Sequence, residues 1–114
     1  MSKVKYILVA ASKGSYDRPI EIDNVKFFES KLLASEEIKK WIWAVDIQDK
    51  LDNIIKLKET HVEDKHGNYH SFKYDEDGIL IFYSTGCPST NEYDGHSCQV
   101  IEIKEEIVWI NIEI

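Results

Sequence analysis

The chain has 114 residues, of which 43% are hydrophobic and 11% aromatic, so it is long and apolar enough for one domain with its own core. This composition excludes a disordered chain, and we expect residues 1–114 to form a single domain. The formal net charge at pH 7 is −7, and Arg18 is the only arginine. Nucleic-acid binding depends on clustered lysine and arginine, so this charge argues against a nucleic-acid partner and favours a basic protein.

The N-terminal segment MSKVKYILVAASKGS begins with lysines and an apolar run, as a signal peptide does. The run YILVAA is shorter than the roughly 7–15 apolar residues of a typical signal sequence, and its alternation suits a buried strand. No stretch approaches the roughly 20 apolar residues that a membrane helix needs. We therefore expect a first strand here, in a cytoplasmic protein without a membrane partner.

The next segment, from residue 23 to residue 57, has helical spacing of its apolar residues. Asp23 and Asn24 are both good N-caps, and Ser35 offers a second start. After Val45 the apolar stripe moves to another face, so one bent helix and two successive helices are both allowed. A strand at WIWAVDI is the competing interpretation, because its apolar residues also alternate. The apolar positions that predict helix are Phe27, Ala34, Ile38, Trp41 and Val45, followed by Ile47, Leu51 and Ile54.

From Lys58 onward, β-branched and aromatic residues are interrupted by turn signals at KHGN (65–68) and DEDG (75–78). The second of these begins like a calcium-binding loop but lacks the later ligands, so it predicts only a hairpin turn. Short strands with short connections are typical of an antiparallel meander. We expect an α+β fold, with one or two helices packed on a mainly antiparallel sheet of about five strands. The predicted strands in this part are KETHVED, NYHSFKY, ILIFYS, QVIEI and IVWINIEI.

The segment GCPSTNEYDGHSC (86–98) contains two cysteines and a histidine. The spacing of Cys87 and Cys98 is not that of a zinc site. The two cysteines could be close enough for a disulfide, but in the cytoplasm they would stay reduced. His96 and Cys98 would point to the same face of an extended segment, which allows a catalytic Cys–His pair. We expect a polar loop with reduced, partly buried cysteines.

A second candidate site lies around the KHGN turn. A hairpin turn at residues 66–67 would place Glu63 opposite His70, with His61 on the same face, which is the ligand set of a two-histidine, one-carboxylate iron site. A turn one residue later would instead place His70 opposite Lys65. A small metal-dependent or thiol enzyme using His61, Glu63 and His70, or Cys98 and His96, is therefore the alternative to a binding protein. The main expectation is no enzyme, no metal and no cofactor.

Asp46, Asp49 and Asp52 recur every three residues, so on a helix they lie on the side opposite the apolar stripe. Together with Asn53 they would present a row of carboxylates to a cationic cleft. Residues 88–96 would add a second contact, with Tyr93 as an aromatic anchor beside Glu92 and Asp94.

These features together are typical of small acidic proteins that block a partner by occlusion. We expect an immunity or antitoxin protein that neutralises a basic toxin nuclease, with a phage-encoded inhibitor of a host defence nuclease as the alternative of the same class. The alternating C-terminal segment would also allow a homodimer through strand pairing.

Overall fold

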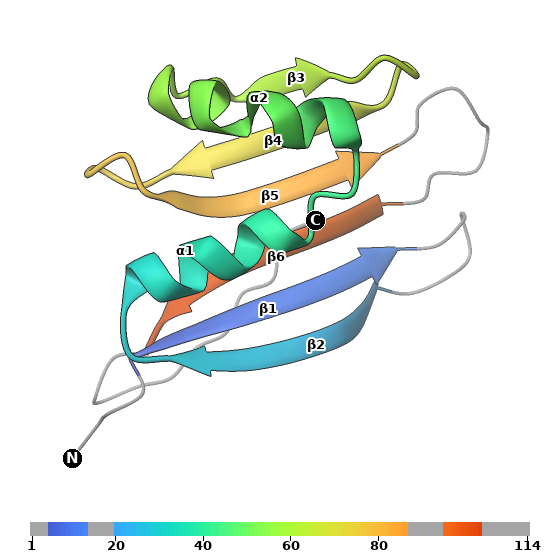
Figure 1. Ribbon diagram of the computed structural model, residues 1–114. Coiled ribbons are helices and arrows are strands. Elements are labelled where there is room, and N and C mark those ends of the chain that lie inside the picture. The colour runs from blue at the N-terminus through green and yellow to red at the C-terminus, as the bar shows by residue number, and fades with distance from the viewer. Residues whose placement is uncertain (1–4, 14–19, 87–94, 104–114) are drawn as a thin grey trace.

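The computed structural model describes residues 5–13, 20–86 and 95–103, and these form one antiparallel sheet with two helices on the same face (Figure 1). The predicted α+β fold is confirmed, with six strands among the described residues where about five were expected. No helix in these ranges is both long and apolar enough to cross a membrane. In chain order the elements are β1 (Tyr6–Lys13), β2 (Ile20–Phe28), α1 (Lys31–Lys40), α2 (Val45–Lys56), β3 (His61–Glu63), β4 (Tyr69–Tyr74), β5 (Leu80–Gly86) and β6 (Gly95–Glu102).

The strand order is β2-β1-β6-β5-β4-β3. The sheet therefore consists of an N-terminal hairpin, β1–β2, and a meander, β3 to β6, joined where β1 pairs with β6. In that ladder Tyr6 lies opposite Glu102 and Lys13 opposite Gly95. The helix pair connects β2 at one edge of the sheet to β3 at the other, so the chain crosses the whole face between them (Figure 1).

The helix start predicted at Asp23 or Asn24 is wrong, because these residues belong to strand β2. Ala10 pairs with Asn24 and Ala11 with Ile22, so Asp23 is the extra residue of a β-bulge. The bulge interrupts the two-residue alternation from which a strand is recognised. Helix α1 begins later, at Lys31.

The cap of α1 is Ser30, whose hydroxyl accepts a hydrogen bond from the backbone N–H of Leu33 at 3.1 Å. Ser35, the other predicted start, is instead buried within the helix.

Two separate helices are found, so the predicted strand at WIWAVDI is wrong. Helix α1 ends at Lys40, residues 41–44 form a linker, and α2 begins at Val45. The side chain of Gln48 holds this break, because its amide nitrogen donates to the backbone oxygens of Lys39 at 2.6 Å and Ile42 at 2.7 Å. One of these carbonyls lies in the last turn of α1 and the other in the linker, so Gln48 fixes the path of the chain between the helices.

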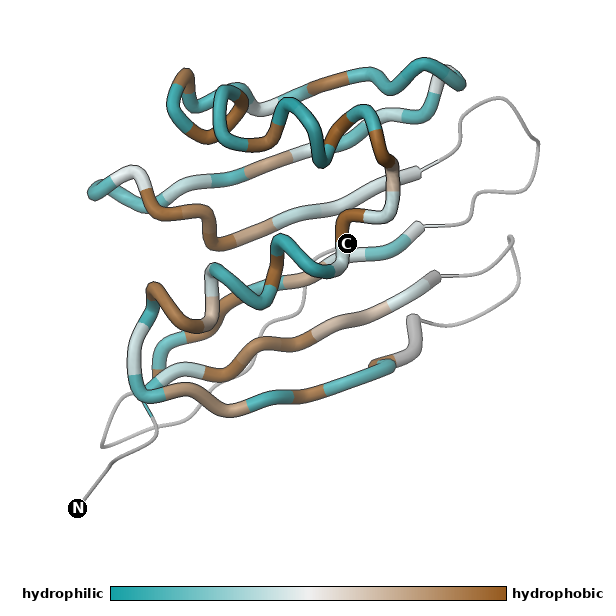
Figure 2. Tube along the Cα trace, viewed as in Figure 1, coloured by the Kyte–Doolittle hydropathy of each residue, from teal (hydrophilic) through white to brown (hydrophobic). Residues whose placement is uncertain are grey.

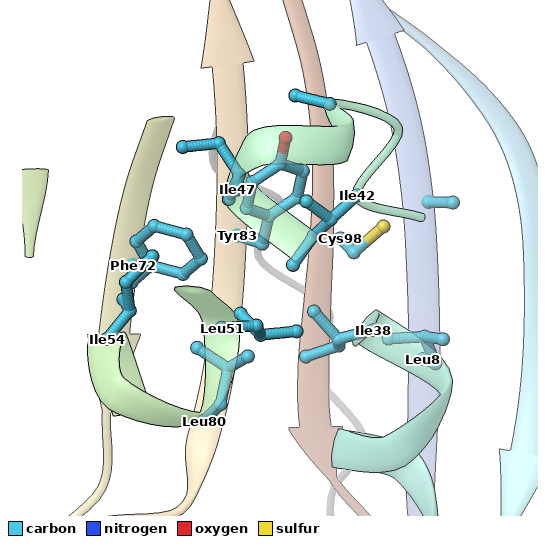
Figure 3. Packing of buried hydrophobic residues seen from close by; sticks show 12 residues of the cluster. Leu8, Ile38, Ile42, Ile47, Leu51, Ile54, Phe72, Leu80, Tyr83 and Cys98 are labelled. Atoms are coloured by element: carbon cyan, nitrogen blue, oxygen red, sulfur yellow. The ribbon is translucent and has the colours of Figure 1, made fainter. Parts of the chain in front are cut away.

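Most of the predicted apolar stripe faces the sheet, but Phe27 lies in β2 and Val45 is exposed at the start of α2. Ile38 of α1 and Ile47, Leu51 and Ile54 of α2 are buried, and along α2 hydrophobic residues alternate with hydrophilic ones (Figure 2). Side chains from β1, β4, β5 and β6 and from the linker complete the buried core. Figure 3 shows the cluster, which also contains Leu8, Ile42, Phe72, Leu80, Tyr83 and Cys98.

Strand β1 explains the apolar run YILVAA. Leu8 and Ala10 face the helices, and Ile7, Val9 and Ala11, which point to the other face, are also buried. A strand that is buried on both faces has a nearly continuous apolar sequence rather than a strict alternation.

Replacement of Leu51 by alanine should lower the free energy of unfolding by about 2–5 kcal/mol, because it leaves a cavity where a side chain is only 4% exposed. Leu32→Ala is the matched control, since that leucine is 61% exposed on α1 and its loss should change stability by less than about 0.5 kcal/mol. Urea denaturation of both variants measures the difference. Equal effects would contradict the described packing of α2.

Candidate functional site

Two hairpin turns have the same construction. In the β3–β4 turn, Oδ1 of Asp64 accepts hydrogen bonds from the backbone N–H groups of His66 and Asn68, at 2.9 and 3.0 Å. In the β4–β5 turn, Asp75 accepts equivalent bonds from residues 77 and 79, both at 2.9 Å. Each turn has a glycine with positive φ three residues after the aspartate, Gly67 at 84° and Gly78 at 79°. The turns predicted at 65–68 and 75–78 are thus confirmed, and the preceding aspartates hold them.

The second oxygen of Asp64 begins a buried chain of hydrogen bonds. Nε2 of His70 lies 2.9 Å from Oδ2 of Asp64, and Nδ1 of His70 lies 2.7 Å from the hydroxyl oxygen of Tyr83. All three side chains are buried. Because an ionised carboxylate only accepts, Nε2–H of His70 donates to it, and Nδ1 of the same ring is hydrogen-bonded to the Tyr83 hydroxyl. The chain connects the β3–β4 turn to β5, at the centre of the sheet.

The surroundings keep the two ends of this chain in opposite states. Burial by itself would raise the pKa of Asp64, but hydrogen bonds from His70, Asn68 and His66 outweigh it and hold the pKa well below its usual value. Burial raises the pKa of the Tyr83 hydroxyl well above its usual range. At neutral pH the chain therefore contains a carboxylate and a phenol that keeps its proton, which makes Tyr83 a poor nucleophile.

A pocket of about 210 Å³ lies next to Tyr83, between the α1–α2 linker and the sheet. Trp41 and Trp43 line it from the linker, and Ala10 and Cys98 line it from the sheet. The pocket exists for two reasons. The helices are interrupted above this position, and the strand residues below it have small side chains.

The predicted iron site is not formed, because neither of the two expected registers occurs. Val62 pairs with His70 and Glu63 with Tyr69, so His70 faces the helices whereas His61 and Glu63 lie on the other face of the sheet. The Asp64 turn is longer than a two-residue turn, and this sets the register. In the part of the chain that the structure describes, no group of three or more His, Cys, Asp or Glu side chains is arranged to hold a metal ion.

His96 and Cys98 lie on strand β6 and both line the pocket, as expected for residues on the same face of an extended segment. Cys98 is a free cysteine and is buried, and burial raises the pKa of its thiol to about 12. Near neutral pH the thiol is therefore protonated, and a protonated thiol is a weak nucleophile. Cys87, its expected neighbour across the loop, lies outside the described residues.

The acidic helical face is present on α2. Asp49, Asp52 and Asn53 are exposed, on the side opposite the buried stripe. Asp46 is only partly exposed, and its Oδ2 accepts a hydrogen bond from the backbone N–H of Lys65 at 2.9 Å. Asp46 thus joins α2 to the β3–β4 turn in addition to its predicted place on the contact face. The other predicted contact residues, Glu92, Tyr93 and Asp94, lie outside the described ranges.

An exposed apolar pair adjoins this face. Trp43 is 57% exposed and Val45 is 69% exposed, at the end of the linker and the start of α2. Val45 and Asp49 are four residues apart and so are neighbours on the helix surface. We call Trp43, Val45, Asp49 and Asp52 together the Trp43 surface.

Sequence reasoning missed the Asp64–His70–Tyr83 chain and the role of Trp43. One signal for the chain was present, since His70 alternates with Phe72 and Tyr74 in β4 and so shares their core-facing side. Trp43 was taken as part of a helix or strand, although the break that exposes it depends on Gln48.

Replacement of Tyr83 by phenylalanine should lower the free energy of unfolding by about 1–3 kcal/mol, because it leaves a buried nitrogen of His70 without its hydrogen bond. Tyr69→Phe removes a hydroxyl from a tyrosine that is 52% exposed and should have almost no effect. Denaturant titration compares the two. A Tyr83→Phe variant as stable as the wild type would show that this hydrogen bond makes no net contribution to the free energy of unfolding.

The Asp64 carboxylate should make stability depend on acid pH. Its pKa is lower in the folded than in the unfolded protein, so its contribution is complete above the ordinary aspartate pKa of about 3.9 and is lost as the pH falls below it. Wild-type stability should therefore fall between about pH 5 and pH 2 more steeply than that of Asp64→Asn. Asp49→Asn, at an exposed position, should keep the wild-type slope. Identical slopes for all three proteins would show that folding does not lower the pKa of Asp64.

Comparison with known proteins finds no family, no curated protein and no solved structure that matches this chain. Three features of the structure bear on function: the buried Asp64–His70–Tyr83 chain, the pocket beside it, and the Trp43 surface.

Proposed function

We propose that this protein is a small acidic binding protein that neutralises a basic partner by occlusion, as an immunity or antitoxin protein does to a toxin nuclease in the cytoplasm. One observation carries the proposal. The Trp43 surface combines a half-exposed tryptophan and an exposed valine with the carboxylates of Asp49 and Asp52.

Trp43 has the properties of an interface anchor. Tryptophan is among the residues that most often dominate binding energy at protein interfaces. The ring of Trp43 also lies against the buried ring of His70, with centroids 6.1 Å apart and planes tilted by 55°. A side chain held in this way loses little conformational entropy on binding, which favours slow dissociation.

The charge of the chain supports a basic partner. The formal net charge is −7, and α2, which begins two residues after Trp43, has exposed carboxylates at Asp49 and Asp52. Such a field attracts a cationic surface over a distance and raises the association rate. In the proposed mechanism, carboxylates of the Trp43 surface occupy the positions that nucleic-acid phosphates would take on the nuclease, and the nuclease is blocked.

The first test is to capture partners from the source organism with the tagged protein, washing at low and then at high salt. A single basic protein that is retained in near-equal amount and loosened by salt is expected. If the captured protein is a nuclease, its activity should disappear on addition of this chain. Capture of no basic protein at either salt concentration would refute the proposed function.

Variants then locate the interface by their binding kinetics. Reversal of charge in Asp49→Lys/Asp52→Lys should slow association at low salt and flatten its salt dependence, with Glu76→Lys as a control at another exposed carboxylate. Trp43→Ala should increase the dissociation rate about 5- to 150-fold, equivalent to about 1–3 kcal/mol. Leu32→Ala, on the exposed side of α1, is the control for lost apolar area. Unchanged rates in both sets would move the interface away from the Trp43 surface.

A further inference from the structure

The lining of the pocket behind Trp43 is chemically mixed. Trp41 and Trp43 provide two indole rings, and Asp23 and His96 provide polar groups. Trp43, Asp23 and His96 are exposed, so the pocket opens to solvent on their side. Trp43 belongs both to the pocket and to the Trp43 surface, so a partner bound on that surface lies at the entrance.

The aromatic residues favour a cation. The faces of tryptophan rings attract cations more strongly than those of other aromatic residues, and a guanidinium group can also stack flat against them. A guanidinium group is more weakly hydrated than an ammonium group, which lowers the free-energy cost of moving it from water into a half-enclosed site.

Asp23 provides the opposite charge. It is the extra residue of the β-bulge in β2, and its Oδ1 accepts a hydrogen bond from the Ser12 hydroxyl at 3.1 Å, which orients the carboxylate. The nearby Glu37 already forms ion pairs with Lys26 and Lys40. The Asp23 side chain is thus positioned by Ser12 at the edge of the pocket.

The thiol at the base of the pocket is consistent with a negative potential. Burial is the main cause of the raised pKa of Cys98, and the charges of Glu37 and Asp23 raise it further. A field that disfavours a thiolate at this position favours a cation there.

The size of the pocket also fits. An apolar cavity of about 150 Å³ holds a benzene molecule. At about 210 Å³, this pocket has room for a planar guanidinium group and the end of its alkyl chain, but not for a large cofactor.

We propose that this pocket binds the guanidinium group of an arginine side chain, between Trp41 and Trp43 and paired with Asp23. The arginine belongs to the basic partner, so this inference rests on the proposed function and names the group that the partner inserts. An arginine in this pocket would extend the contact of the Trp43 surface into the body of the protein.

The test uses N-acetyl-arginine-N-methylamide as the probe, with the citrulline analogue as a neutral compound of nearly the same shape. Binding is followed at pH 8 by NMR of the indole N–H groups of Trp41 and Trp43. The arginine compound should cause a saturable shift of both signals, and the citrulline compound should bind at least 10-fold more weakly. Asp23→Asn should weaken arginine binding at least 10-fold, whereas Glu76→Gln, which removes the same charge elsewhere, should leave it unchanged.

The outcomes separate this inference from the proposed function. No saturable shift, or equal affinity for the two compounds, would overturn the arginine pocket even if a basic partner has been captured. Because the citrulline comparison uses the unchanged protein, it decides the question even if Asp23→Asn fails to fold. Selective binding of the arginine compound without a captured partner would refute the proposed function and leave the pocket as a guanidinium site.

Discussion

The hydrogen bond between Tyr83 and His70 connects the β3–β4 turn, the core and the pocket. Tyr83 packs against Phe72 in the core, with ring centroids 5.4 Å apart, and it also lines the pocket. Its hydroxyl joins β5 to the imidazole of β4 and, through it, to the carboxylate that holds the β3–β4 turn. Because an unpaired polar group in such a buried place is costly, the positions of turn, sheet and overlying Trp43 depend on one another.

The break between the helices also determines the exposure of Trp43 and the position of the pocket. A continuous helix across residues 41–44 would place its own side chains over Ala10 and Cys98 and fill the hollow. The side chain of Gln48 instead donates to the backbone oxygens of Lys39 and Ile42, and the chain turns there. As a result Ile42 is buried and Trp43 remains half exposed. Trp43 at the protein surface and the pocket beside it thus both depend on the break between the two helices.

Much of the architecture could be predicted from local patterns, whereas the site could not. The stripe of Ile47, Leu51 and Ile54 and the glycine turns are properties of short segments, and they are found as predicted. Strand β2 was misread because a bulge disturbs its period, and the hairpin register depends on the side chain of Asp64.

The buried chain was missed for a further reason: its members approach one another only when β4 and β5 pair. Likewise, nothing local indicates that Trp41 and Trp43 would lie over two small strand residues. Features of this kind depend on contacts between distant segments, which a single sequence does not display.

The order of the strands has a consequence for how the protein folds. The β1–β2 hairpin and the β3–β6 meander each pair neighbouring segments, but the β1–β6 ladder joins segments from opposite ends of the described chain. Closing that ladder requires the largest loss of chain entropy, so it belongs to the late and slow part of folding. Until it closes, the inner edges of both halves expose unpaired backbone, which gives a chaperone or a second chain the opportunity to bind there.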